Sequence, residues 1–278
     1  MENYKINLKE AGYPVEGGEL ESIAYSRVWD DETLAQNWKR PAVIVVPGGS
    51  YAFVSKREGE PIAGYFLAKG YQTFVLTYLI SGDGVSYPEQ LFELASAVDY
   101  VKKNAEKFHV NPEEVFVVGF SAGGHLTANL AVDYFNVSKR AGVELDCKPT
   151  AVGLSYPVIN KFGHEGSFMH LLNGYTDEAK SMLEKELSLD ECVTAQTAPS
   201  FVWTTAADAV VNPLNSIDYA RACALNKVPY ELHVYPQGGH GLGSCDPETN
   251  VPQACLDKNS GWIENCLTFF RLFVKENI

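Results

Sequence analysis

The chain has 278 residues, of which 46% are hydrophobic, enough to fill the core of one large α/β domain. Its 35 acidic and 22 basic residues give a formal net charge of -13, whose field repels nucleic-acid phosphates and anionic membrane surfaces. The sequence has neither a run of ~18 apolar residues nor a signal-peptide pattern, so we expect a cytoplasmic protein with no nucleic-acid and no membrane partner. The sequence leaves open whether the protein forms a homodimer.

The six cysteines are scattered without a CxxC pair or zinc-type spacing, so the sequence predicts neither a metal centre nor a redox dithiol. We expect free thiols, although the proximity in sequence of Cys245, Cys255 and Cys266 leaves a disulfide open. The chain also lacks HExxH, and the spacing of His164 and His170 is not one that indicates metal binding. No cofactor is expected.

Strand-like segments dominate the chain from its N-terminus. Ile6 and Leu8, then residues 20–28, resemble two strands joined without a helix, as at an antiparallel edge. Short apolar, β-branched runs follow at residues 43–46, 73–78, 115–118, 151–154, 201–204 and 230–235. Helical patterns separate these runs. The clearest follows Pro88, where apolar residues between Leu91 and Val101 recur with the spacing of one helix face.

This alternation predicts the α/β fold class. Continuous apolar strands indicate a mostly parallel sheet with helices on both faces. No repeat or linker divides the sequence, so we predict one domain, residues 1–278, with a cap-like insertion at about 158–198. The apolar residues of the cap can line a pocket or pack onto the main domain, and both stay open: Phe162, Phe168, Met169, Leu171 and Leu172.

A GxSxG motif follows the run 115–118 and precedes a helical pattern over residues 125–135. A nucleophilic serine on a sharp strand-to-helix turn needs small neighbours, because strand and helix approach too closely for a Cβ atom. The motif therefore predicts Ser121 as the nucleophile, with Gly119 and Gly123 forming the elbow.

A serine hydroxyl needs a base, and in this type of fold the acid and then the histidine follow the serine. His240, in a glycine-rich loop after the run 230–235, is the histidine that fits. The other five precede the nucleophile or lie on its helix, in the cap or inside a strand: His109, His125, His164, His170 and His233.

Asp208 is the preferred acid, because it follows the run 201–204 at the predicted carboxyl edge of the sheet. Asp218 competes with it but lies in a helical pattern, where a solvated face is the simpler interpretation. Asp246 follows His240 and would break the chain order. Attack by a serine on a carbonyl group forms a tetrahedral intermediate with a negatively charged oxygen, which backbone N–H groups stabilise. We predict that Gly49, Ser50 and Ala122 donate these N–H groups.

From about Pro41 onward, the sequence resembles the α/β-hydrolase esterases related to hormone-sensitive lipase, and in particular bacterial acetylxylan-esterase-like and sugar-esterase-like members. The residues that carry the resemblance are Pro47-Gly48-Gly49-Ser50-Tyr51, Arg57-Glu58-Gly59-Glu60-Pro61, Asn111-Pro112, Gly119 to Leu126, the Asp208 segment and Gly239-His240-Gly241. The wider family begins its oxyanion loop with histidine and has three glycines, whereas Pro47 and Ser50 stand at the ends here. Arg57 and Glu58 match a family feature near the pocket, for which the sequence suggests no role beyond a surface ion pair.

The resemblance implies an eight-stranded sheet, a Ser121-Asp208-His240 triad and cofactor-free hydrolysis of short acyl esters, often acetyl groups on sugars. A small-molecule acyl ester, such as an acetylated sugar, is thus the expected partner. Two alternatives stay open: a serine peptidase of the same fold, and a non-catalytic binding protein that retains the fold.

Overall fold

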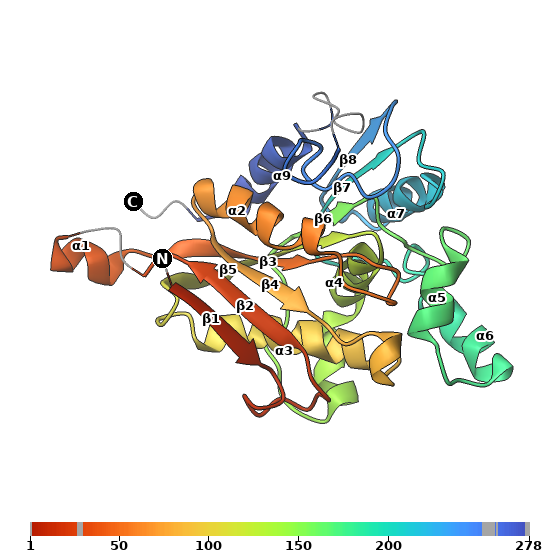
Figure 1. Cartoon of the computed structure of the whole chain (residues 1–278), viewed down its shortest axis with the longest axis horizontal. Coiled ribbons are helices and arrows are strands. Elements are labelled where there is room, and N and C mark those ends of the chain that lie inside the picture. The colour runs from red at the N-terminus through yellow and green to blue at the C-terminus, as the bar shows by residue number, and fades with distance from the viewer. Residues whose placement is uncertain (1, 27–29, 252–258, 260, 276–278) are drawn as a thin grey trace.

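The computed structural model describes residues 2–26, 30–251, 259 and 261–275. In these residues eight strands form one sheet in the order β1-β2-β4-β3-β5-β6-β7-β8 (Figure 1). The strands are β1 (Glu2–Asn7), β2 (Glu19–Ala24), β3 (Arg40–Val46), β4 (Gln72–Thr77), β5 (Val110–Phe120), β6 (Val152–Ser155), β7 (Ser200–Thr205) and β8 (Tyr230–Tyr235). The predicted fold class is confirmed.

The antiparallel pairings lie at the N-terminal edge of this sheet. β2 runs antiparallel to both β1 and β4, and the pairings from β4 across to β8 are parallel. The strand predicted at 20–28 ends early, at Ala24, because the side-chain amide of Gln72 binds both backbone groups of Tyr25 and replaces the ladder there. The last two residues of that prediction, 27–28, lie outside the described residues.

Helices cover both faces of the sheet. They are α1 (Glu32–Asn37), α2 (Glu60–Ala68), α3 (Glu89–Lys103), α4 (Ala122–Ala141), α5 (Glu165–Leu171), α6 (Asp177–Glu186), α7 (Leu214–Leu225) and α9 (Trp262–Arg271). Neighbouring residues of β3 point into different cores: Ile44 and Val46 belong to the core that α3, α4 and α7 share, and Val43 and Val45 belong to the core that α2 and α9 share. Because the inner strands β3, β6 and β7 bury both faces, their sequences do not alternate between apolar and charged residues, whereas β2 near the edge does alternate in burial.

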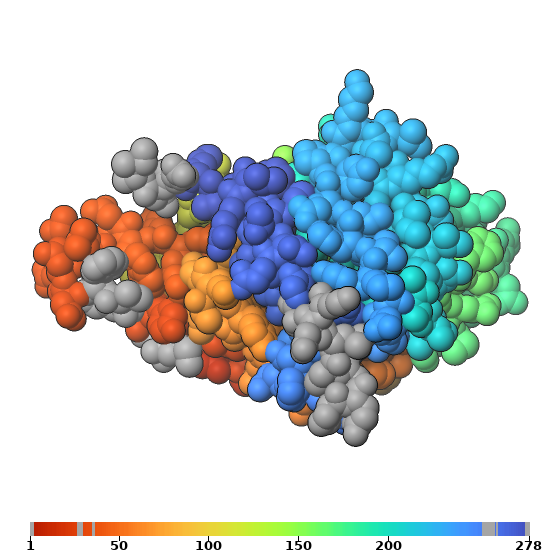
Figure 2. Space-filling view, turned by 90° about the horizontal axis from the view of Figure 1, so that it is seen from above, coloured from red at the N-terminus to blue at the C-terminus, as the bar shows by residue number. Residues whose placement is uncertain are grey.

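Aromatic rings hold α2 and α9 on their shared face of the sheet. The ring of Phe270 on α9 stacks on Phe116 of β5 with centroids 4.4 Å apart, and it lies 6.4 Å from the ring of Phe66 on α2. Figure 2 views the molecule from above and shows the dark blue C-terminal residues beside the orange ones. This packing joins the end of the chain to the strand that leads to Ser121.

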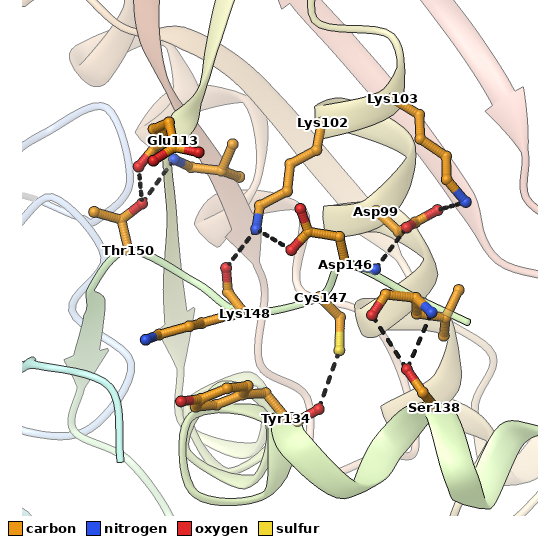
Figure 3. A network of polar contacts seen from close by, with 12 residues as sticks. Asp99, Lys102, Lys103, Glu113, Tyr134, Ser138, Asp146, Cys147, Lys148 and Thr150 are labelled. Carbon is orange, nitrogen blue, oxygen red and sulfur yellow. Dashed lines mark hydrogen bonds and ion pairs between the residues drawn. The ribbon is translucent and has the colours of Figure 1, made fainter. Parts of the chain in front are cut away.

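The connection from α4 to β6 is fastened to α3 by a polar network (Figure 3). Lys102 donates to the Asp146 carboxylate and to the Lys148 carbonyl, at 2.7 and 2.9 Å. The buried Asp99 carboxylate accepts the backbone N–H of Asp146 and pairs with Lys103, each at 2.7 Å. These contacts lie far along α3 and α4 from Ser121, so we assign them to the fold.

The predicted cap segment contains α5 and α6, which Figure 1 shows at the right-hand end of the molecule. Phe168, Leu171 and Leu172 are buried in the same core as α3 and α4. Phe162 and Met169 are instead exposed. Of the two roles left open, packing onto the main domain therefore holds for the three buried side chains.

Candidate active site

The candidate nucleophile lies on a tight turn between β5 and α4. Ser121 has φ 52° and ψ -115°, a strained backbone for a residue with a Cβ atom, and α4 begins at the next residue. A Cβ at Gly119 would overlap Thr127 Oγ1 and the carbonyl of Gly123. A Cβ at Gly123 would overlap the carbonyl oxygens of Val46 and Pro47. Both predicted elbow glycines thus sit where strand and helix backbones touch.

Ser121, His240 and Asp208 are joined by two short hydrogen bonds. The Ser121 Oγ to His240 Nε2 distance is 2.7 Å, and the His240 Nδ1 to Asp208 Oδ2 distance is also 2.7 Å. Because Asp208 only accepts when ionised, the imidazole carries its proton on Nδ1 and leaves Nε2 to accept from the serine hydroxyl. The arrangement is therefore aligned for proton transfer from Ser121 to His240.

Asp208 is fixed at the carboxyl end of β7. Its Oδ1 accepts the backbone N–H groups of Val210 and Val211 at 2.9 and 3.0 Å. Burial alone would raise the pKa of Asp208, but the hydrogen bond and charge of His240 and these N–H groups outweigh burial and lower it. Asp208 therefore stays ionised opposite His240.

The two competing aspartates lie elsewhere. Asp218 is on α7, as its sequence pattern predicts. Asp246 accepts from Ser244 Oγ at 2.7 Å and from the hydroxyl of Tyr65, so it shapes the loop after His240.

The loop after β3 contains two of the predicted oxyanion donors and has an unusual backbone. Gly49 has φ 132°, where an added Cβ would collide with the Phe53 carbonyl, and Ser50 has φ 55°. The described residues supply no hydrogen-bond acceptor to the N–H groups of Gly49, Ser50 or Ala122. All three predicted donors are thus free to bind an oxyanion.

Two side chains form hydrogen bonds to carbonyl groups of this loop. The Tyr78 hydroxyl donates to the Pro47 carbonyl at 2.9 Å from the end of β4. His170 of α5 lies with Nδ1 3.1 Å from the Ser50 carbonyl, which can only accept, so Nδ1 carries the proton. The cap thus contacts the oxyanion loop directly, which the sequence does not predict.

The surface ion pair expected for Arg57 and Glu58 is wrong, because both side chains bind other groups. Glu58 ends a short 3-10 helix, η1 (Lys56–Glu58), and is only 3% exposed. Its carboxylate accepts the N–H of Gly48 at 2.9 Å and the hydroxyl of Tyr156 at 2.7 Å. Arg57 points elsewhere and donates to the Thr249 carbonyl at 2.7 Å. The pair separates because consecutive residues of the turn face opposite sides.

His125 is a packing residue, as the sequence favours. Its Nε2 lies 3.3 Å from the Leu187 carbonyl, and its Nδ1 lies 2.9 Å from the Tyr51 hydroxyl. Full burial lowers its pKa to about 4, against a small opposing effect of the Leu187 carbonyl. A neutral His125 therefore joins α4, the oxyanion loop and the cap.

An open cavity of about 960 Å³ adjoins His240. Its lining includes Arg57, residues 238–242 and residues 247–251. Ser121 is not part of that lining, so the cavity lies beside the nucleophile rather than over it.

Four cysteines are free thiols: Cys147, Cys192, Cys223 and Cys266. Burial raises the pKa of Cys147 and Cys192 to about 11, which makes them poor nucleophiles. Cys255 lies outside the described residues, so a disulfide there stays a prediction. Within the described part of the chain, no cluster of three His, Cys, Asp or Glu side chains can hold a metal ion, and no helix is long and apolar enough to cross a membrane.

The parallel sheet, the serine turn at its carboxyl edge and the Ser121-His240-Asp208 arrangement define an α/β-hydrolase. The family model described as BD-FAE matches residues 33–222, and the chain belongs to this family. The resemblance to esterases inferred from the sequence is thereby confirmed.

Two curated relatives carry names connected with xylan. Endo-1,4-beta-xylanase B of Butyrivibrio fibrisolvens is 34% identical over 217 residues, which cover 76% of this chain and 34% of that protein. An acetylxylan esterase of Xylanibacter ruminicola is 28% identical over 218 residues, covering 76% of this chain and 42% of that protein. The chain thus spans less than half the length of either relative.

Two solved structures match nearly the whole chain. A carboxylesterase of Lactobacillus plantarum has a TM-score of 0.85 at 27% identity, covering 99% of this chain and 100% of its own. An acetyl ester-xyloside bifunctional hydrolase of Caldicellulosiruptor lactoaceticus has a TM-score of 0.79 at 29% identity, covering 98% and 97%. The chain is therefore similar over its length to esterase-like hydrolases.

Proposed function

We propose that this chain is a serine carboxylesterase that hydrolyses short-chain acyl esters, chiefly acetyl groups on sugars or oligosaccharides. The observation that carries the proposal is the pair of 2.7 Å hydrogen bonds from Ser121 to His240 and from His240 to Asp208. Because these bonds align a serine hydroxyl, an imidazole and an ionised carboxylate, they favour acyl transfer over simple binding.

In the proposed reaction, Ser121 Oγ attacks the acyl carbon while His240 Nε2 takes the hydroxyl proton. The tetrahedral oxyanion is stabilised by the N–H groups of Gly49, Ser50 and Ala122. His240 then protonates the departing alcohol oxygen, and an acyl-enzyme remains on Ser121. Water attacks this ester with His240 again as base, and the carboxylic acid leaves as the proton returns to Ser121.

The substrate class is supported by the neighbours rather than by a bound ligand. One relative is called an acetylxylan esterase and one structural neighbour an acetyl ester-xyloside hydrolase, so acetylated xylo-oligosaccharides are the first substrates to test. The cap supports a short acyl group, because its buried side chains Phe168, Leu171 and Leu172 are taken up by the main core and do not form a long apolar tunnel.

The test compares the wild-type protein with Ser121→Ala on p-nitrophenyl acetate, butyrate and octanoate, and on acetylated xylo-oligosaccharide. We expect kcat/KM to fall with acyl length and Ser121→Ala to lose roughly 10⁴-fold or more. Ser138→Ala is the matched control, because Ser138 binds only the backbone of Leu145 on the far part of α4. Acetate release from the sugar would support the carbohydrate substrate.

A fluorophosphonate probe separates the alternatives. Labelling of Ser121 without turnover of any ester would contradict the esterase proposal and direct the search to peptide substrates. If the probe also fails to label Ser121, the hypothesis of a non-catalytic binding protein replaces the esterase proposal, since only an activated serine reacts with the probe.

A further inference from the structure

We propose that Glu58 is a positioning residue that keeps the oxyanion loop and the His240 loop in their working geometry. This inference rests on the proposed function, because it concerns the same reaction. Glu58 touches neither the nucleophile nor the imidazole by hydrogen bonds, so any effect it has on the reaction passes through its two partners, Gly48 and Tyr156.

Neutral groups alone hold the buried carboxylate in place. Oε2 accepts the Gly48 N–H at 2.9 Å, and Oε1 accepts the Tyr156 hydroxyl at 2.7 Å. Within the described residues, no lysine, arginine or histidine forms an ion pair with Glu58. Burying a carboxylate without a cationic partner costs free energy, and the hydrogen bonds from Gly48 and Tyr156 are what offsets that cost.

The hydrogen bond to Gly48 fixes the peptide bond that precedes the proposed oxyanion donor Gly49. The Pro47 carbonyl accepts the Tyr78 hydroxyl, and the N–H of the same peptide, from Gly48, donates to Glu58. A peptide group is planar, so holding its oxygen and its N–H sets the direction in which the chain enters Gly49 and Ser50. Gly48 also packs on the nucleophile, since a Cβ there would lie 2.9 Å from both Ser121 Cβ and Glu58 Oε2.

The other partner connects Glu58 to the loop that carries the base. The Tyr156 hydroxyl donates to Glu58 and accepts the N–H of Gly243, at 2.7 and 2.9 Å. The Tyr156 ring meets the His240 ring edge-on, with centroids 5.0 Å apart. One continuous chain of hydrogen bonds therefore runs from the oxyanion loop through Glu58 and Tyr156 to the loop of His240.

A carboxylate accepts from both partners at once. The Gly48 N–H can only donate, and the Tyr156 hydroxyl accepts the Gly243 N–H and donates its own proton to Glu58. Glu58→Gln changes the side-chain volume very little but leaves one accepting oxygen. If this oxygen faces Gly48, the NH₂ group donates to the Tyr156 hydroxyl, whose own proton then has no acceptor; if it faces Tyr156, the Gly48 N–H loses its acceptor.

The experiment measures kcat and KM separately with p-nitrophenyl acetate for the wild type, Glu58→Gln, Tyr156→Phe and the double variant. We expect kcat to fall about 10- to 100-fold in each single variant with KM within about 3-fold of wild type, because small misplacements of donors slow the chemical step. Since both residues act through one contact, the double variant should lose little more than the worse single variant.

Glu114→Gln is the matched control. Glu114 is a second buried glutamate, on β5 near the start of the strand, and its carboxylate accepts the Lys275 N–H at 2.9 Å. It lies in the first half of β5, whereas Ser121 follows the last residue of that strand, so we expect its kcat to match wild type even where the melting temperature falls.

Three outcomes decide the inference. If wild type hydrolyses the ester and both Glu58→Gln and Tyr156→Phe keep kcat within about 2-fold, or change KM alone, the positioning role is wrong and the proposed function stands. If Glu58→Gln does not fold, Tyr156→Phe decides on the same criterion. If wild type itself shows no Ser121-dependent turnover, the proposed function fails and this inference falls with it.

Discussion

The elbow and the cap meet at the same site but are held by different interactions. At the elbow, backbone touches backbone: α4 and β3 leave no room for a Cβ at Gly119 or Gly123. The cap, besides its packing in the main core, reaches the site through a side-chain hydrogen bond, from His170 to the Ser50 carbonyl.

This difference predicts how each region responds to substitution. Close-packed backbone cannot shift without moving a strand, so a change at the elbow should act on the whole fold. A side-chain hydrogen bond can be lost while the surrounding helix stays, so a change in the cap should act on the geometry of the site by a graded amount. The three predictions below run from the elbow to the cap.

The largest effect is expected for Gly123→Ala. The added methyl group would overlap the carbonyl oxygens of Val46 and Pro47, so we expect the free energy of unfolding to fall by about 3 kcal/mol or more in urea denaturation. Gly64→Ala on α2 is the control, because nothing lies within 4 Å of its Cβ position and a helical alanine gains about 0.5 to 1 kcal/mol. A Gly123→Ala protein as stable as wild type would contradict the comparison.

The two regions also differ in how far the sequence predicted them. The elbow is local in sequence, so the GxSxG spacing and the neighbouring strand and helix were enough to place Gly119, Ser121 and Gly123. Chain order then selected His240 and Asp208, and in the structure His240 binds Ser121 and Asp208 binds His240; their catalytic roles stay proposals.

Contacts between distant segments could not be predicted in this way. Glu58 meets Tyr156 across 98 residues, and His170 meets Ser50 across 120 residues. Hydrophobic periodicity describes which face of an element is buried, but it does not describe which polar side chain crosses to which loop. The same limit applies to the cap, whose apolar residues left both packing and pocket lining open.

An intermediate effect is expected where elbow and cap join, at His125. Burial lowers its pKa from 6.5 to about 4, so the folded protein keeps it neutral while the unfolded chain takes up a proton. The stability that neutral His125 allows is present above pH 6.5 and is lost as the pH falls toward 4. The loss amounts to roughly 3 kcal/mol, at 1.36 kcal/mol for each unit of pKa difference.

Urea denaturation at several pH values between 7 and 4 measures this loss. His125→Gln should be less stable than wild type at pH 7, because it loses packing, but its stability should vary less with pH across this window. His164→Gln is the control, since His164 also has a lowered pKa but is less completely buried, and its effect on the slope should be smaller. Equal slopes for wild type and His125→Gln would show that another group titrates in this range.

The smallest effect is expected for His170, the contact from the cap to the oxyanion loop. His170→Ala removes the hydrogen bond from Nδ1 to the Ser50 carbonyl, so Ser50, with φ 55°, loses one of the groups that hold its backbone. We expect kcat/KM for p-nitrophenyl acetate to fall about 3- to 10-fold while the free energy of unfolding changes by less than about 1 kcal/mol. His170→Asn should recover much of the activity, because its amide nitrogen can occupy the place of Nδ1, whereas Met169→Ala at the exposed neighbouring position should change nothing. Full activity in His170→Ala would mean that the oxyanion loop keeps its shape without the cap, and the division of the site into a rigid elbow and an adjustable cap would then fail.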